Sequence, residues 1–251
     1  MNTWWKKYVT SPVINTIGKA RERYLFDDPP VLIGGCARSG TSLLLSILSA
    51  HPNIHAIPVE SDAFTEWDES GKPVRLDRFY RQLLSGPVKK GAGRWCEKRP
   101  YNVRYISEIF TYFESKVKFI HIIRDPRAVC TSVHPQKPNQ YWVSPDRYIH
   151  DVTIGLAYES HPNLLSIKFE DLITKQEDTL QAICHFLKEP YTEELKNWLN
   201  HATIKTNRAW FDGLNDIKEL RSWDQPIHHV RVQEILSNTA MLNLMAKLGY
   251  S

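Results

Sequence analysis

A glycine-rich segment at residues 34–42 carries the residues best suited to bind an anionic group. It reads GGCARSGTS and lies between the apolar runs VLI and LLLSIL. This pattern predicts a buried strand, a tight turn and a helix whose first N–H groups attract a phosphate or a sulfate. Arg38 adds a cationic fork to the turn, and Thr41 and Ser42 add hydroxyl donors. The segment therefore predicts a site for a phosphate-like group.

The same segment lacks the lysine of an ordinary nucleoside-triphosphate site. Gly35 and Gly40 have the glycine spacing of the Walker A pattern, but Thr41 stands where that pattern has its lysine. The cation lies inside the turn instead, as Arg38. Taken alone, the segment also fits a plain strand-to-helix turn with a solvated arginine, so the rest of the chain has to decide between the two interpretations.

Two further motifs place positive charge after predicted strands. Arg124 follows the apolar run FIHII, and Ser132 comes eight residues later, about two helical turns further on. The pair could clamp a second phosphate. In the alternative interpretation Arg124 forms only a surface ion pair while Asp125 caps the helix. Lys98 follows the short predicted strand 94–97, where a lone lysine is usually a solvated charge.

The composition indicates one sizeable domain and excludes several classes of protein. A chain of 251 residues with 42% hydrophobic content is long enough for a single core. The formal net charge of +4 does not indicate nucleic-acid binding, but it suits an anionic ligand. The four cysteines are far apart and show no metal-binding spacing, which predicts reduced thiols, no metal site and a cytoplasmic protein. No apolar run has the length of a transmembrane helix, and nothing indicates an oligomeric state.

Strands and helices are expected to alternate along the chain. This alternation predicts an α/β fold: a single P-loop-like domain with a mainly parallel central sheet flanked by helices on both faces. We interpret residues 1–30 as an N-terminal extension that packs on the domain of residues 31–251, and residues 61–94 as a variable acceptor-side segment. The expected strands are 31–34, 55–57, 94–97, 118–123 and 164–168, and the expected helices include 40–50, 102–114, 145–160, 178–187 and 230–248.

In this order, the motifs resemble those of the P-loop-type sulfotransferases that use 3′-phosphoadenosine 5′-phosphosulfate (PAPS). Within that family, the motifs are most similar to those of the tyrosylprotein sulfotransferases and related bacterial enzymes. The segments that carry the resemblance are VLIGGCARSGTS, AHP at 50–52, CEKRP at 96–100, RDPR at 124–127 and FEDL at 169–172. The resemblance covers residues 31–251 and is weakest over 61–94. It implies PAPS as the donor, adenosine 3′,5′-bisphosphate (PAP) as the product, and no need for a bridging metal.

The resemblance also assigns donor-binding roles. It implies that Arg124 and Ser132 hold the 3′-phosphate and that the glycine-rich turn holds the 5′-phosphosulfate. The residues of that turn are Gly35, Arg38, Ser39, Gly40, Thr41 and Ser42.

A sulfuryl acceptor must lose its hydroxyl proton, so a base is required. Glu60 stands where the tyrosylprotein type holds its glutamate, after a one-residue shift in the alignment; the alternative is a surface glutamate that caps the turn at 61–64. Lys98 and Arg38 would then stabilise charge on the transferred group. Those relatives carry a basic residue two positions after the glutamate. Asp62 stands there in this chain, which argues against the same acidic peptide substrate.

The sequence therefore predicts a sulfotransferase that acts on a hydroxyl acceptor, which is a carbohydrate, a small molecule or a tyrosyl group. A P-loop nucleotide kinase or NTPase is the first alternative, although the chain lacks the lysine and the acidic Mg²⁺ ligand. A non-catalytic PAP- or PAPS-binding protein is the second, although it would need neither Glu60 nor Lys98. The histidines are weaker candidates for the base: His51, His121, His134, His228 and His229. The aromatic residues of 61–94 either stack on the acceptor or, by default, pack a hydrophobic cluster.

Overall fold

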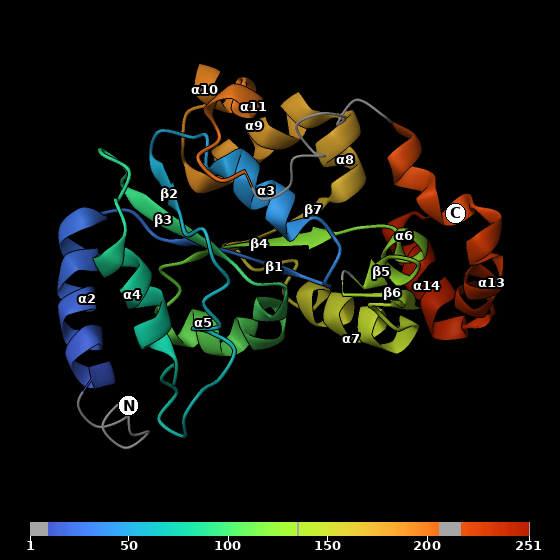
Figure 1. Ribbon diagram of the computed structural model, residues 1–251, viewed down its shortest axis with the longest axis horizontal. Helices are drawn as coiled ribbons and strands as arrows, with labels where there is room; N and C mark the ends of the chain where they lie inside the picture. Colours follow the sequence, from blue (N-terminus) through green and yellow to red (C-terminus); the bar gives the residue numbers. More distant parts are fainter. Residues whose placement is uncertain (1–9, 135, 206–216, 251) are drawn as a thin grey trace.

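A parallel sheet of five strands forms the centre of the computed structural model, which describes residues 10–134, 136–205 and 217–250 (Figure 1). The strand order is β2-β3-β1-β4-β7, and every neighbouring pair in the sheet is parallel. The strands are β1 (Val31–Gly35), β2 (Ile54–Ala56), β3 (Arg94–Lys98), β4 (Lys118–Ile123) and β7 (Leu164–Lys168). The predicted fold class is confirmed. Because all the strands run the same way, their carboxyl ends meet at one edge of the sheet.

Helices cover both faces of the sheet (Figure 1). On one face lie α3 (Thr41–Leu48), α8 (Phe169–Thr174), α9 (Gln176–Leu187), α10 (Glu193–Lys196) and α11 (Trp198–His201). On the other lie α4 (Leu76–Ser85), η2 (Pro100–Tyr105), α5 (Ile106–Tyr112) and α7 (Pro145–Leu156), with α2 (Ser11–Leu25) packed beside α4. The remaining elements lie beyond the end of β4: α6 (Pro126–Cys130), β5 (Val133–His134), β6 (Lys137–Tyr141), η3 (Ile217–Asp224), η4 (Pro226–His228), α13 (His229–Ser237) and α14 (Thr239–Leu248).

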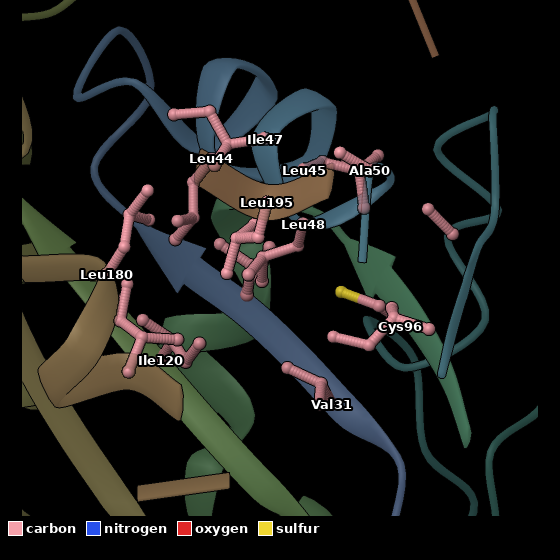
Figure 2. Packing of buried hydrophobic residues seen from close by; sticks show 14 of the residues in the cluster. Val31, Leu44, Leu45, Ile47, Leu48, Ala50, Cys96, Ile120, Leu180 and Leu195 are labelled. Atoms are coloured by element: carbon pink, nitrogen blue, oxygen red, sulfur yellow. The ribbon is translucent and has the colours of Figure 1, made fainter. Parts of the chain in front are cut away.

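The helix that follows the glycine-rich turn is held firmly in the core. Leu44, Leu45 and Leu48 of α3 point into a cluster with Val31 and Ile120 of the strands beneath (Figure 2). Nearly the whole of α3 is buried. Its first turn is therefore fixed just beyond the end of β1, where its free N–H groups face the edge of the sheet.

The segment 61–94 packs against the opposite face. Phe64, Phe79 and Tyr80 are buried there with Trp95 of β3, and the Phe64 and Trp95 rings stack at 6.1 Å. Glu22 of α2 accepts hydrogen bonds from the Tyr80 hydroxyl at 2.8 Å and from Trp95 Nε1 at 2.7 Å. The default interpretation of these aromatic residues, a hydrophobic cluster, therefore describes this part of the chain.

Two local predictions are corrected by the structure, which also contains one element that was not predicted. The expected single helix 230–248 is two helices, because the Asn238 side chain caps α14 by accepting a hydrogen bond from the Met241 N–H at 3.0 Å. The helix expected at 145–160 ends at Leu156. The hairpin β5–β6 was not expected.

Two other predictions can be compared with the described part of the chain. All four cysteines are free and buried, and the described residues contain no cluster of His, Cys, Asp or Glu that could hold a metal ion. Among these residues, no helix has the length and apolar character needed to cross a membrane.

Candidate active site

A cavity of about 640 Å³ lies at the carboxyl edge of the sheet. Each of the five strands is followed, or ended, by a residue that lines it. In the chain order of the strands these residues are Arg38, Glu60, Lys98, Arg124 and Phe169. The site is thus assembled from segments that are far apart in the sequence and are brought together by the parallel sheet.

Most of the predicted site residues share this cavity. Eight of them line it: Arg38, Gly40, Thr41, Ser42, Glu60, Lys98, Arg124 and Ser132. Gly35 and Ser39 do not, and Ser39 is fully buried behind the turn. Although 61–94 was predicted to lie on the acceptor side, no residue of this fully described segment lines the cavity, because its aromatic side chains are drawn into the core.

The glycine-rich turn depends on Gly40. This residue caps α3 in the left-handed conformation, with φ of 98°, and a Cβ atom there would overlap the Phe169 ring. Both the backbone conformation and the close approach of α8 therefore favour glycine. Arg38 also has a positive φ, of 71°, and its side chain reaches Ser132, two residues after α6.

We expect Gly40→Ala to distort the turn and to weaken binding of the anionic ligand, because the new methyl group must displace either Phe169 or the backbone. Gly71→Ala is a matched control, since Gly71 also has a positive φ, of 72°, but no atoms lie within 4 Å of the position of its Cβ. Isothermal calorimetry with PAP, together with thermal melts of both variants, measures the difference. Equal PAP affinity in the Gly40→Ala variant and the wild type would contradict the prediction.

The two predicted anion-binding motifs contact each other directly. Arg38 Nε donates a hydrogen bond to Ser132 Oγ at 2.6 Å, and Arg124 Nη1 donates to the Arg38 carbonyl at 3.4 Å. The Arg124 guanidinium lies 4.2 Å from the centre of the Phe169 ring. The Tyr148 hydroxyl holds the Arg124 backbone by donating to its carbonyl at 2.6 Å. Two guanidinium groups and a hydroxyl are therefore gathered on one wall.

The second wall carries a carboxylate between two cations. Glu60 forms ion pairs with Lys98 Nζ and Arg99 Nη1. Lys98 is only 9% exposed, and this burial lowers its pKa to about 8, although the nearby charge of Glu97 opposes the shift. Among the described residues that line the cavity, Glu60 is the one carboxylate and no histidine is present. Glu60 and Lys98, which sequence reasoning predicted as the base and as a charge-stabilising cation, are thus in direct contact.

The predicted alternatives for the base lie elsewhere. His51 is tied to the Pro190 carbonyl at 2.9 Å, and His134 stacks on Trp142. His121 is fully buried, and this burial lowers its pKa to about 4. His228 lies beside the Tyr141 hydroxyl at 3.1 Å. None of these histidines lines the cavity.

Sequence reasoning missed a group of arginines around Tyr101. The guanidinium groups of Arg99, Arg104 and Arg147 lie 5.5, 4.5 and 5.0 Å from the centre of the Tyr101 ring. Buried Asp151 pairs with Arg104 at 2.5 Å and with Arg147 at 3.6 Å. Arg99 could have been found from the sequence, because it lies in the CEKRP motif. Arg147 comes from α7, and only the fold brings it to the cavity.

An α/β domain with a glycine-rich anion-binding turn and paired arginines defines a P-loop-type group-transfer or nucleotide-binding protein. Residues 28–211 match the sequence model of the sulfotransferase domain. Because this match covers most of the chain, the protein belongs to the sulfotransferase family.

A curated relative agrees with this family, and two solved structures share its fold. Protein-tyrosine sulfotransferase 1 of Danio rerio is 28% identical over an alignment 244 residues long, which covers 84% of this chain and 66% of the relative, so the chain spans only part of that protein's length. The sulfotransferase domain from the curacin biosynthetic pathway superposes with a TM-score of 0.58 at 16% identity, covering 90% of this chain and 99% of that one. A mouse sulfotransferase complexed with PAP gives a TM-score of 0.51 at 12% identity, covering 92% and 94%. The two structural matches support the fold.

Proposed function

We propose that this protein transfers a sulfuryl group from PAPS to a hydroxyl acceptor. The observation that carries the proposal is the meeting of Glu60 and Lys98 in the same cavity as the glycine-rich turn and Arg124. A site that only bound the nucleotide would not need a carboxylate and a buried lysine in contact beside it. The family match, and the relative named for protein-tyrosine sulfation, support the same reaction.

The residues on the first wall fit the donor. PAPS carries a phosphosulfate and a 3′-phosphate, and the wall offers Arg38, Arg124 and Ser132 with the N-terminus of α3. We assign the 5′-phosphosulfate to the glycine-rich turn and the 3′-phosphate to Arg124 and Ser132. When bound, the donor supplies the sulfuryl group and the bisphosphate leaving group.

The protein's part in the reaction is to position the reactants and to stabilise charge. Glu60 accepts the proton of the acceptor hydroxyl while the oxygen of that hydroxyl forms the new bond to sulfur. The bond from sulfur to the bridging phosphate oxygen breaks, and its electron pair leaves with PAP. Lys98 and Arg38 offset the negative charge on the bridging and sulfuryl oxygens, as cations do in phosphoryl transfer.

We propose a tyrosyl hydroxyl as the first acceptor class to test, on the name of the zebrafish relative. Asp62 bears on how acidic the acceptor can be. It binds Arg99 Nε at 2.7 Å and Arg78 Nη1 at 3.3 Å, so these two cations already have a carboxylate partner. An acceptor flanked by many acidic residues would therefore compete with Asp62 for the same arginines, which supports a less acidic acceptor.

Incubation with ³⁵S-labelled PAPS and a panel of tyrosyl peptides, phenols, saccharides and lipids tests the transfer. PAP titration by calorimetry tests the donor site, and Arg124→Ala should weaken PAP binding much more than binding of the 5′-monophosphate, because only PAP has the 3′-phosphate. Label transfer to any hydroxyl supports the proposal. PAP binding without transfer would favour a binding protein, and Mg²⁺-dependent ATP binding without PAP binding would favour a kinase or an NTPase.

A further inference from the structure

A second glutamate, Glu97, lies buried directly before Lys98 on β3. It is fully inaccessible to solvent and does not line the cavity. Burial of a carboxylate is unfavourable unless hydrogen bonds replace the lost water. Glu97 has such partners, because its Oε1 accepts from the Ser61 hydroxyl at 3.2 Å and its Oε2 accepts from Asn102 Nδ2 at 2.9 Å.

These partners belong to the segments that carry Glu60 and Arg99. Ser61 directly follows Glu60, in a stretch after β2 that has no helix or strand. Asn102 lies in η2, where its N–H donates to the Arg99 carbonyl at 2.9 Å and its side chain donates to the Ile33 carbonyl in the middle of β1 at 3.4 Å. Glu97 thus joins the loop of Glu60 to β3 and, through Asn102, to β1.

We propose that Glu97 is a positioning residue that holds Glu60 beside Lys98 by accepting the hydrogen bond of the Ser61 hydroxyl. This inference rests on the proposed role of Glu60 as the base. The ion pairs of Glu60 and Asp62 hold the side chains of this loop, and the Ser61 hydroxyl links its backbone to the core, because it donates to Glu97 and accepts from the Ala63 N–H at 3.2 Å. Without the carboxylate, the Ser61 hydroxyl is buried without an acceptor, and the loop is expected to turn it toward water.

Burial raises the pKa of Glu97 to about 7, while the hydrogen bonds from Asn102 and Ser61 and the charge of Lys98 lower it. The Glu97 carboxylate therefore accepts hydrogen bonds from Ser61 on one side and from Asn102 on the other. Its role in this geometry is to accept these hydrogen bonds, and not only to carry a charge.

The experiment compares three variants of the full chain. Glu97→Met keeps the length of the side chain but removes both acceptor oxygens. Glu97→Gln keeps a carbonyl for Ser61, and the Asn102 amide can rotate to accept from the new NH₂ group. Glu22→Met is the matched control, because Glu22 also accepts two side-chain hydrogen bonds on the same face of the sheet, from Tyr80 and Trp95. Glu22 does not line the cavity.

We expect Glu97→Met to lower kcat on the order of 100-fold, the cost of a misplaced catalytic group, with PAP affinity unchanged. Glu97→Gln should recover most of that loss, and Glu22→Met should keep the wild-type kcat. Amide hydrogen exchange at Ser61 and Ala63 should accelerate in Glu97→Met alone. Wild-type kcat in Glu97→Met, or equal losses of kcat and PAP affinity, would overturn the proposal.

The same experiment separates the two proposals. Absence of sulfuryl transfer by the wild type would overturn the proposed function. Amide exchange would then still decide whether Glu97 holds the loop, and unchanged exchange at Ser61 and Ala63 in Glu97→Met would overturn the positioning role as well.

Discussion

Glu60→Gln is expected to lower kcat by about 10²- to 10⁴-fold, the usual contribution of a general base. Glutamine has nearly the same shape and can still accept hydrogen bonds from Lys98 and Arg99, but it cannot take the proton of the acceptor hydroxyl. PAP affinity should stay at the wild-type value, because Glu60 lies on the wall opposite Arg124 and Ser132 in our assignment. Steady-state kinetics with labelled PAPS, together with PAP calorimetry, measure both quantities.

Asp62→Asn is the matched control for this variant. Asp62 lies two residues away in the same loop and pairs with the same Arg99, but it does not line the cavity. With an acceptor that carries no acidic residues, and therefore does not compete with Asp62 for Arg99 and Arg78, the control should keep kcat close to the wild-type value. If Glu60→Gln instead lost PAP affinity while kcat at saturating donor was retained, Glu60 would be a structural residue and the base would have to be sought elsewhere.

Lys98→Ala is expected to reduce kcat by about 10²- to 10³-fold, as the loss of one group that stabilises transition-state charge does. Lys98 is the buried cation that adjoins the proposed base, and no other lysine lines the cavity among the described residues. Lys89→Ala is a control of the same residue type, because the Lys89 ammonium binds the Ser49 and His51 carbonyls outside the cavity. Wild-type turnover in Lys98→Ala would show that the assigned role is wrong.

The pKa of Lys98 adds a pH dependence to this prediction. Burial lowers that pKa to about 8, so the side chain is a cation below this pH and loses its charge as the pH rises through it. If the cation is needed, wild-type kcat should fall above about pH 8. Lys98→Arg stays charged throughout this range, so its alkaline limb should move to higher pH even if its kcat is lower. An unchanged alkaline limb in Lys98→Arg would assign the pH dependence to another group.

The positions of Glu60 and Arg38 explain why the cavity has two chemically different walls. Arg38 lies in a turn that is set by Gly40 and by the packed helix α3, and this wall presents hydrogen-bond donors and positive charge. Glu60 lies in a loop that leaves β2 at the edge of the sheet, where Lys98 ends the neighbouring strand β3. The wall that we propose to bind the donor is built on elements packed in the core. The wall with the proposed base depends on side-chain hydrogen bonds such as that of Ser61.

The sequence by itself determined the fold class, the glycine-rich turn and eight of the residues that line the cavity. These features are local: apolar runs of strand length, glycine where the backbone must turn, and a cation directly after a strand. Parallel connectivity then placed all the strand ends at one edge, so Lys98 and Arg124 could be assigned to the same site before any distance was known.

Only the tertiary structure decided which side chains meet within that site. The contact of Arg38 with Ser132 joins residues 94 positions apart, and the arrival of Arg147 beside Tyr101 depends on how α7 packs. The role of 61–94 also depended on packing, because burying Phe64 and Phe79 against Trp95 removes apolar surface from water and leaves these rings unavailable to a ligand. Such contacts arise from the packing of distant segments, which no local pattern of residues encodes.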